Sequence, residues 1–367
     1  MDKGSIKRGL PRLTMRKSLG LMSVLLAPIL ASGQTTPSEL ADLSLEELLN
    51  IDLVSDTETA DNARWEFGYT FYKAEFGGYK NGTRDLSFDE VLFSPGEARS
   101  SENFPVVPTY ISQKVHLFSA SYRLNERNTI TLSLPLIGQE TDHISSVPGF
   151  DEFILESNGL GDIGVNLVRT FETGASDVLQ ASAGIRIPTG SINVMGDTPR
   201  NGSGTDERLP YTMQLGSGTF DLTAGLNYTH IFKDFHLGAA ATTIIRTGKN
   251  DHNYRLGHGL TTSVNARYVK SVHFQPGLKA GYRKIGSISG QDDGLTIPGP
   301  FPYPAAITNP ANYGGDIFSI SVNALICLKD DCELSLNTEF TQPVHQNLNG
   351  IQPKVRDKFS LGAKVRF

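Results

Sequence analysis

Apolar and polar residues alternate one by one along many stretches of this chain, and the pattern is clearest in KFSLGAKVRF, residues 358–367. A period of two puts the apolar residues on one face of a β-strand and the remaining residues on the other. Here the second face carries charges, at Lys364 and Arg366. This combination is typical of a strand that meets lipid on one side and water on the other.

The chain contains twelve predicted strands of this kind. Most exceed the roughly 5–6 residues of an ordinary globular strand and reach about 9–11, the length that crosses a bilayer when tilted. Residues 112–124 fit least well, because Val115 and Leu117 interrupt the polar face. The predicted strands are residues 65–74, 112–124, 127–137, 159–172, 177–188, 217–231, 234–247, 258–270, 272–285, 315–327, 332–342 and 357–367.

The predicted connections alternate between a few residues and long segments rich in Gly, Pro, Asn and Asp. The connections at one end of the structure are therefore short and those at the other end are long, as in barrels with short periplasmic turns and long extracellular loops. We predict an all-β fold, an antiparallel up-and-down transmembrane β-barrel of about 12 strands over residues 61–367. The long loops are residues 75–111, 138–158, 189–216, 248–257, 286–314 and 343–356.

The first residues predict export. Six basic residues precede or flank the start of an apolar run over 19–30, and three small residues follow it, which is the order found in a secretory signal peptide. We expect residues 1–33 to be cleaved. In the following segment, residues 34–60, Ser44 and Glu47 have the spacing of a capping box and predict a short helix. This segment would lie in the periplasm or tuck into the barrel lumen.

Net charge and hydropathy narrow the class further. The formal net charge of the whole chain is −6. Without residues 1–33, which hold six basic residues and one acidic residue, it becomes −11. A chain with this negative net charge has no basic surface of the kind that binds nucleic acid. No later stretch reaches 18 apolar residues, so no transmembrane helix is predicted. We expect a barrel in the outer membrane of a Gram-negative cell, surrounded by its lipid. The final aromatic residue, Phe367, resembles the signal by which the barrel-assembly machinery recognises its substrates.

The face opposite the apolar one would line the lumen. A charge facing hydrocarbon costs about 2–4 kcal/mol at the bilayer midplane, so charges are expected inside whatever the function. Two interpretations stay open: a network of ion pairs that stiffens the barrel, or a passage that favours anionic solutes. The lumen-lining candidates are Arg123, Arg186, Arg246, Arg267, Lys279, Arg283, Lys364 and Arg366, with the anions Glu66, Asp162, Glu333 and Glu339.

Two further features concern the connections. The loop 291–313 carries five prolines together with Phe301 and Tyr303. It is either a plain surface loop, the simpler interpretation, or a constriction that folds inward on these aromatic residues. Cys327 and Cys332 flank a tight turn and predict a structural disulfide in an oxidising compartment. Two thiols without a nearby histidine make only half a structural zinc site.

Catalysis is not indicated. The eight histidines are scattered, and none stands in a recognisable metal or triad motif. The string LGHGLTTS does not match the arrangement expected of an outer-membrane phospholipase. We predict no enzyme activity, no catalytic residues, no metal and no cofactor.

Three strings carry a family resemblance: NGLGDIGVNLVRTF, SAGIRIPTG and LGSGTFDLTAGLNYTHIF, at residues 158–171, 182–190 and 215–232. They resemble the outer-membrane transporter family associated with meta-pathway phenol degradation, most clearly over residues 158–285. The resemblance implies passive uptake of small aromatic or hydrophobic solutes and supplies no binding residues. The alternative is a structural or surface-interaction barrel whose lumen is blocked.

Overall fold

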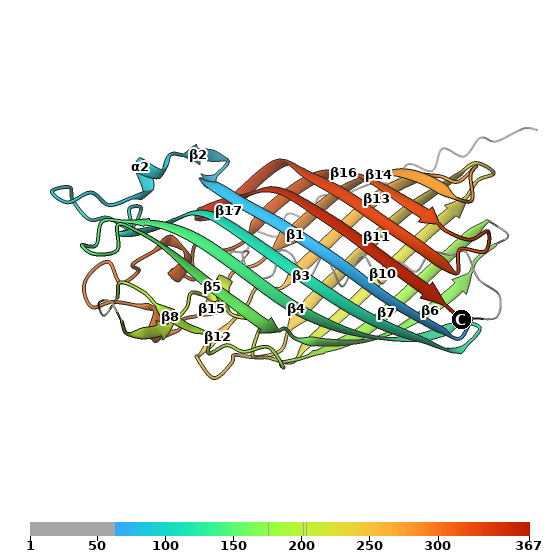
Figure 1. Ribbon diagram of the computed structural model, residues 1–367, viewed down its shortest axis with the longest axis horizontal. Helices are drawn as coiled ribbons and strands as arrows, with labels where there is room; N and C mark the ends of the chain where they lie inside the picture. Colours follow the sequence, from blue (N-terminus) through green and yellow to red (C-terminus); the bar gives the residue numbers. More distant parts are fainter. Residues whose placement is uncertain (1–62, 175, 201, 203) are drawn as a thin grey trace, which may run out of the picture. The chain divides into compact units, whose positions relative to one another are not determined.

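The computed structural model describes residues 63–367 except 175, 201 and 203. The predicted signal peptide, residues 1–33, and the predicted helix within residues 34–60 lie outside this range. The described residues form an antiparallel β-sheet that closes on itself, so the predicted all-β closed barrel is confirmed. Figure 1 shows the strands tilted around the barrel, with Phe367 at one end and α2, β2, β8, β12 and β15 toward the other.

Eleven strands form the ring, in the order β17-β16-β14-β13-β11-β10-β7-β6-β4-β3-β1, and pairing of β17 with β1 closes it. Two further strands belong to the same sheet, β2 beside β1 and β5 beside β4. The ring strands are β1 (Trp65–Gly82), β3 (Val106–Asn125), β4 (Asn128–Ser145), β6 (Ile163–Glu172), β7 (Asp177–Ile187), β10 (Asp221–Ile231), β11 (Phe235–Arg246), β13 (Gly259–Tyr268), β14 (Phe274–Ile285), β16 (Gly315–Cys327) and β17 (Leu334–Arg366).

The remaining elements are short and belong to the connections. They are the strands β2 (Arg84–Leu86), β5 (Glu152–Leu160), β8 (Met195–Asp197), β9 (Asp206–Arg208), β12 (Tyr254–Arg255) and β15 (Ser289–Gly290), the helix α2 (Phe88–Val91), and the 3-10 turns η1 (Tyr211–Met213), η2 (Asp293–Leu295) and η3 (Ala306–Thr308). In the part of the chain that the structure describes, no helix has the length and apolarity needed to cross a bilayer.

Closure joins segments that are 300 residues apart in sequence. Glu66 of β1 lies opposite Arg366 of β17, and Phe67 lies opposite Val365. The long strand β17 pairs with two neighbours: residues 335–348 pair with β16, and residues 351–366 together with Leu348 pair with β1. Every ring strand therefore has a partner on both sides, which removes the exposed edges that would otherwise invite aggregation.

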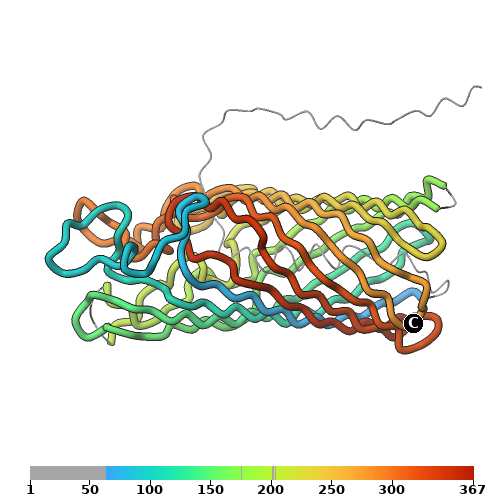
Figure 2. The backbone as a smooth tube through the Cα atoms, turned by 90° about the horizontal axis from the view of Figure 1, so that it is seen from above, coloured from blue at the N-terminus to red at the C-terminus, as the bar shows by residue number. Residues whose placement is uncertain are grey.

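The two ends of the barrel differ. At one end, called here the turn end, two to six residues join β3 to β4, β6 to β7, β10 to β11, β13 to β14 and β16 to β17. At the other, the loop end, the connections include residues 83–105, 188–220, 247–258 and 286–314. Figure 2 shows the same asymmetry from above.

Outward side chains of the ring strands form an apolar band. Exposed members include Trp65, Phe67 and Tyr69 on β1, Phe118 on β3, Phe235, Leu237 and Ile245 on β11, Phe318 and Ile320 on β16, and Phe359 and Leu361 on β17. The inward positions between them are polar, including Thr70, Ser321 and Ser360, all buried. This is the lipid-outside, water-inside pattern that the sequence alternation predicts.

The pattern inverts toward the loop end. On β1, the apolar outward residues of 65–71 give way to Lys73 and Glu75. The inward residues Ala74 and Phe76 are buried at 2% and 1% exposure. Five segments predicted as loop, residues 75–82, 106–111, 138–145, 152–158 and 343–356, are therefore strand. The prediction was wrong there because polar residues such as Lys73, Glu75 and Glu140 occupy outward positions on these strands, so the expected alternation is missing.

The same inversion explains the poor fit of residues 112–124. Val115 and Leu117 point inward and are fully buried, and they pack with Tyr72, Ile137 and Leu215. They interrupt the polar face because the barrel interior becomes apolar at this level.

Candidate functional site: the barrel interior

A polar cavity of about 190 Å³ occupies the barrel interior between the two ends. Most of its wall comes from β10, β11, β13, β14, β16 and β17. Many of the lining side chains carry amides or hydroxyls: Asn227, Thr242, Thr261, Ser263, Asn265, Ser319, Ser321, Asn323, Ser335, Asn337, Thr338 and Thr341. Such a surface offers many hydrogen-bond donors and acceptors to a solute or to water.

Asparagines lie over glycines in this wall. Asn265 and Asn323 stand directly across from Gly238 and Gly277 on the neighbouring strands. A Cβ atom on either glycine would overlap the amide oxygen of its partner asparagine. The glycines therefore let the amides lie flat against the wall, which keeps the lumen wider than larger side chains would allow.

Five of the predicted lumen residues meet at this cavity. Arg267, Lys279, Arg283 and Lys364 line it, and Glu339 lies among them. Lys279 forms an ion pair with Glu339, whose carboxylate also accepts a hydrogen bond from Thr341 Oγ1 at 3.1 Å. The cavity wall thus combines a cationic excess with one internal ion pair.

Other predicted residues form separate ion pairs nearer the two ends. At the turn end, Arg366 Nε donates to Glu66 Oε2 at 2.6 Å, and Lys364 Nζ lies 3.9 Å from the same carboxylate. Toward the loop end, the fully buried Asp221 pairs with Arg246. Asp221 also lies opposite Arg186 in the register of β7 and β10.

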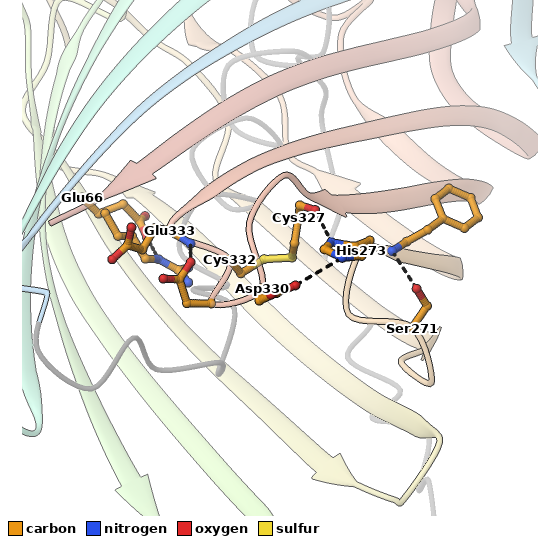
Figure 3. The surroundings of a disulfide bond; sticks show 10 residues. Glu66, Ser271, His273, Cys327, Asp330, Cys332 and Glu333 are labelled. Atoms are coloured by element: carbon orange, nitrogen blue, oxygen red, sulfur yellow. Dashed lines mark hydrogen bonds and ion pairs between the residues drawn. A yellow bond between two sulfur atoms is a disulfide. The ribbon is translucent and has the colours of Figure 1, made fainter.

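Two predicted lumen residues lie at the turn end, away from the cavity. Arg123 lies next to Leu124 near the end of β3, and it is partly exposed. Glu333 stands in the turn between β16 and β17, where its carboxylate accepts from Lys329 Nζ at 3.0 Å. In that turn Cys327 and Cys332 form a disulfide. Figure 3 shows His273 beside this disulfide, with Nδ1 3.1 Å from the Cys327 carbonyl oxygen.

The loop end is filled by a hydrophobic cluster, called here the inner core. Strand residues such as Phe76 and Ile111 pack there against the loop residues Leu256, Leu295 and Ile307. At its centre are three tyrosines with 1% exposure, Tyr211, Tyr254 and Tyr313. The ring of Tyr211 meets those of Tyr254 and Tyr313 edge-on, at 4.7 and 5.7 Å between centroids. Burial raises the pKa of the Tyr211 and Tyr313 phenols above the usual value.

The proline-rich loop contributes to this filling. Ala305, Ala306 and Ile307 are buried, whereas Phe301 and Tyr303 are half-buried. The Phe301 ring lies 5.6 Å from the guanidinium of Arg99, and Tyr303 packs against a second cluster around Tyr79. Residues 305–307 are therefore more buried than Phe301 and Tyr303.

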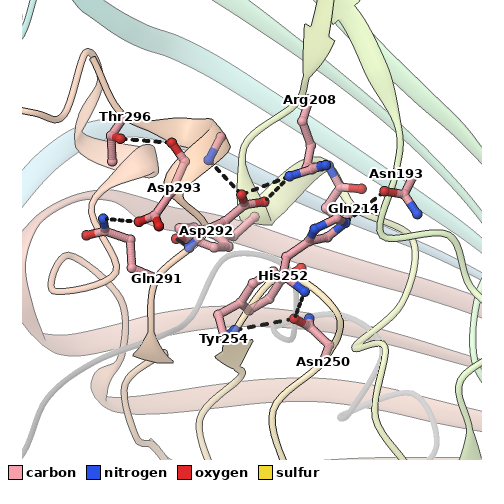
Figure 4. A network of polar contacts seen from close by, with 12 residues as sticks. Asn193, Arg208, Gln214, Asn250, His252, Tyr254, Gln291, Asp292, Asp293 and Thr296 are labelled. Atoms are coloured by element: carbon pink, nitrogen blue, oxygen red, sulfur yellow. Dashed lines mark hydrogen bonds and ion pairs between the residues drawn. The ribbon is translucent and has the colours of Figure 1, made fainter. Parts of the chain in front are cut away.

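A salt bridge joins the two longest loops, and Figure 4 shows it. Arg208 Nη1 donates to both carboxylate oxygens of Asp292, at 2.8 and 2.9 Å. The Asp292 side chain is only 4% exposed. It also accepts from the Gly294 amide at 2.9 Å, while the Asp292 amide donates to the Tyr211 hydroxyl at 2.9 Å. Sequence analysis missed this pair, because residues 84 apart in two irregular loops leave no periodic signal.

The three strings that carry the family resemblance meet in space where the loop end begins. Asp162 of GLGD accepts from the Gly190 amide of IPTG at 2.9 Å and from the Ser217 amide of LGSG at 2.8 Å. Thr189 Oγ1 donates to the Gly161 carbonyl at 2.7 Å. A Cβ on Gly190 would collide with the Leu215 carbonyl. These motifs thus fasten the 188–220 loop to the barrel wall.

Within the described residues, no group of three or more His, Cys, Asp or Glu side chains is arranged to hold a metal ion.

Comparisons with known proteins bear on the fold. No family model matches the chain, and no curated protein matches it. Among solved structures, the chain is similar to an outer membrane channel from Pseudomonas putida F1, with 13% identity and a TM-score of 0.53, over 85% of this chain and 99% of that one. This likeness shows that the two chains share the closed, antiparallel β-barrel fold.

Two further solved structures are less similar to this chain, with TM-scores below 0.5, and they carry no argument here. A Pseudomonas aeruginosa FadL homologue has 12% identity and a TM-score of 0.41, over 83% of this chain and 91% of that one. The Ralstonia pickettii toluene transporter TbuX has 10% identity and a TM-score of 0.41, over 83% and 90%.

Proposed function

We propose that this protein is an outer-membrane channel for the passive uptake of small aromatic or hydrophobic solutes. The observation that carries the proposal is a closed barrel with an apolar outer band, a polar internal cavity and the fold of an outer-membrane channel. The resemblance of residues 158–285 to the transporters associated with meta-pathway phenol degradation supports the aromatic class.

The placement in the membrane is part of the proposal. We count twelve membrane-crossing strands, taking the two halves of β17 separately and β5 with β6 as one interrupted strand. The turn end would face the periplasm and the loop end the exterior. Residues 1–33 would direct export, and Phe367 would be read by the assembly machinery during insertion. No catalytic step is proposed.

The charged residues of the interior suggest what the cavity favours. Arg267, Lys279, Arg283 and Lys364 surround it with one anion, Glu339. Fixed charges of one sign along a pore favour ions of the opposite sign. We propose that solutes with a carboxylate or another negative group pass more readily than cations of the same size.

A blocked barrel is the second candidate, because the inner core fills the loop end and a barrel of this size has little spare interior. Single-channel recording in planar bilayers separates the two. A channel gives discrete conductance steps, and a KCl gradient then gives a reversal potential whose sign reports anion preference. Liposome swelling with benzoate and with benzylammonium, matched in size, tests the solute charge. No conductance and no swelling would favour the blocked barrel, and a clear cation preference would contradict the proposed charge selection.

A further inference from the structure

A basic patch lies on the outer surface just beyond the apolar band. It is called here the rim patch and consists of Lys73 and Lys80 on β1, Lys114 on β3, and Lys354 and Arg356 on β17. These three strands are neighbours in the ring. The apolar band ends directly beside the patch, since Lys73 stands opposite Phe359 and two residues from Phe71.

The patch brings like charges together. Lys73 stands directly opposite Lys114 in the register, and both face outward. Like charges in such a cross-strand pair destabilise a sheet. Lys73 pairs with Glu75, and the Lys114 side chain is exposed. A bound anion would offset this repulsion.

Two glycines make room for two of the three remaining cations. The Arg356 side chain passes over Gly77 and that of Lys354 over Gly78, where an added Cβ would lie 3.2 Å from each. Lys354 and Lys80 share one carboxylate, that of Asp85, at 2.7 and 3.1 Å. The patch therefore holds five cations beside three anions (Glu75, Asp85 and Asp357), in a chain whose net charge is negative.

The charge is specific to one side of the barrel. Beyond the band on β4 and β5, the charged outward residues are acidic, and Glu140 stands directly opposite Glu156 with both side chains exposed. A cationic fringe for general solubility would not divide in this way. The rim patch is therefore suited to a negatively charged partner that approaches from one side, at the level where lipid ends.

We propose that the rim patch binds the phosphate groups of an anionic glycolipid of the outer leaflet. The proposal rests on the membrane location given above. The phosphates would meet Lys73, Lys114 and Arg356, with the acyl chains against the aromatic side chains of the band beside them, such as Phe118 and Phe359. Charge-assisted contacts to phosphate supply the affinity, and the adjoining apolar surface supplies the preference for a lipid over a free ion.

The test measures binding of fluorescent, bis-phosphorylated lipid A to the refolded full-length protein in zwitterionic micelles. The test variants are Lys73→Gln with Lys114→Gln, and separately Arg356→Gln. The matched control is Lys284→Gln, which removes an exposed lysine on β14 paired loosely with Asp316 at 3.7 Å. About fivefold weaker binding is expected per cation removed and roughly 25-fold for the double variant. Lys284→Gln should leave the Kd unchanged.

Three outcomes would overturn the inference: an unchanged Kd in the double variant, equal binding of lipid A stripped of its phosphates, or complete displacement by millimolar inorganic phosphate. The last would mean that the patch is a site for a free anion. Planar-bilayer conductance of the same double variant separates this inference from the proposed function. Normal conductance with unchanged lipid binding refutes the patch alone, whereas a protein that does not float with lipid vesicles in a density gradient refutes the membrane location as well.

Discussion

Replacing Asp292 by alanine is expected to release the two longest loops from each other and open the loop end. Asp292 is nearly fully buried and accepts from Arg208 twice and from the Gly294 amide. Removing one partner of a buried ion pair costs about 3–5 kcal/mol. The Arg208 side chain is 24% exposed and regains some water, so we expect about 2–3 kcal/mol here.

This loss acts on the equilibrium between packed and released loops. At 1.36 kcal/mol per factor of ten, it raises the released fraction roughly 30- to 150-fold. The assay is single-channel recording, in which Asp292→Ala should show more frequent or larger openings than the native protein. Limited proteolysis should cut the variant faster within residues 188–220 and 286–314.

Asp293→Ala provides the matched control. Its carboxylate is exposed and accepts from Gln291 within the same loop, at 3.0 Å. The same substitution one residue away should leave conductance and proteolysis unchanged. Native behaviour in Asp292→Ala, or an equal effect in Asp293→Ala, would refute the idea that the Arg208 salt bridge holds the loop end closed.

The remaining predictions concern pH, selectivity and the turn end. Burial lowers the pKa of His143 on β4, beyond the apolar band, from 6.5 to about 4. Between these pH values the unfolded chain binds a proton that the folded protein excludes, so the free energy of unfolding should fall by up to about 3 kcal/mol as pH drops from 6.5 to 4. Urea titrations at several pH values check this, and an undiminished pH slope in His143→Gln would contradict it. Glu339→Gln removes the cavity anion and should shift the reversal potential toward greater anion preference, whereas an unchanged potential would show that the cavity does not set selectivity. The Cys327→Ser, Cys332→Ser double variant should lose about 2 kcal/mol, from the entropy of so short a loop, with conductance unchanged in bilayers. Equal stability under reducing and oxidising conditions would argue against that contribution.

The sequence predicted the part of the barrel whose outward face is apolar. There a strict period of two marks each strand, and residues 315–327 agree with β16 at both ends. It failed where the strands continue past the band, as in 343–356, because polar residues then face outward and the interior turns apolar. Val115 and Leu117 already indicated in the sequence that the interior turns apolar, but they were interpreted as a poor fit to the strand pattern.

The interior could be predicted only in part. Strand parity predicts that Lys279 and Glu339 share the inward face, since parity needs only the alternation along each strand, and both residues line the cavity. The inner core depends on which loops fold inward, and contacts such as Tyr211 with Tyr313 join irregular segments about 100 residues apart. No local pattern encodes such contacts.

The apolar band has an uneven height, and this has a consequence for the surrounding bilayer. On β11 it extends from Phe235 to Ile245, and on β1 only from Trp65 to Phe71. At about 3.3 Å per residue and a tilt of about 40°, these spans are about 25 and 15 Å. A bilayer that matches β11 is too thick for β1, so hydrophobic mismatch draws the leaflets together on one side of the barrel. The membrane beside β1 would be locally thinned, with its headgroups lowered toward the strand.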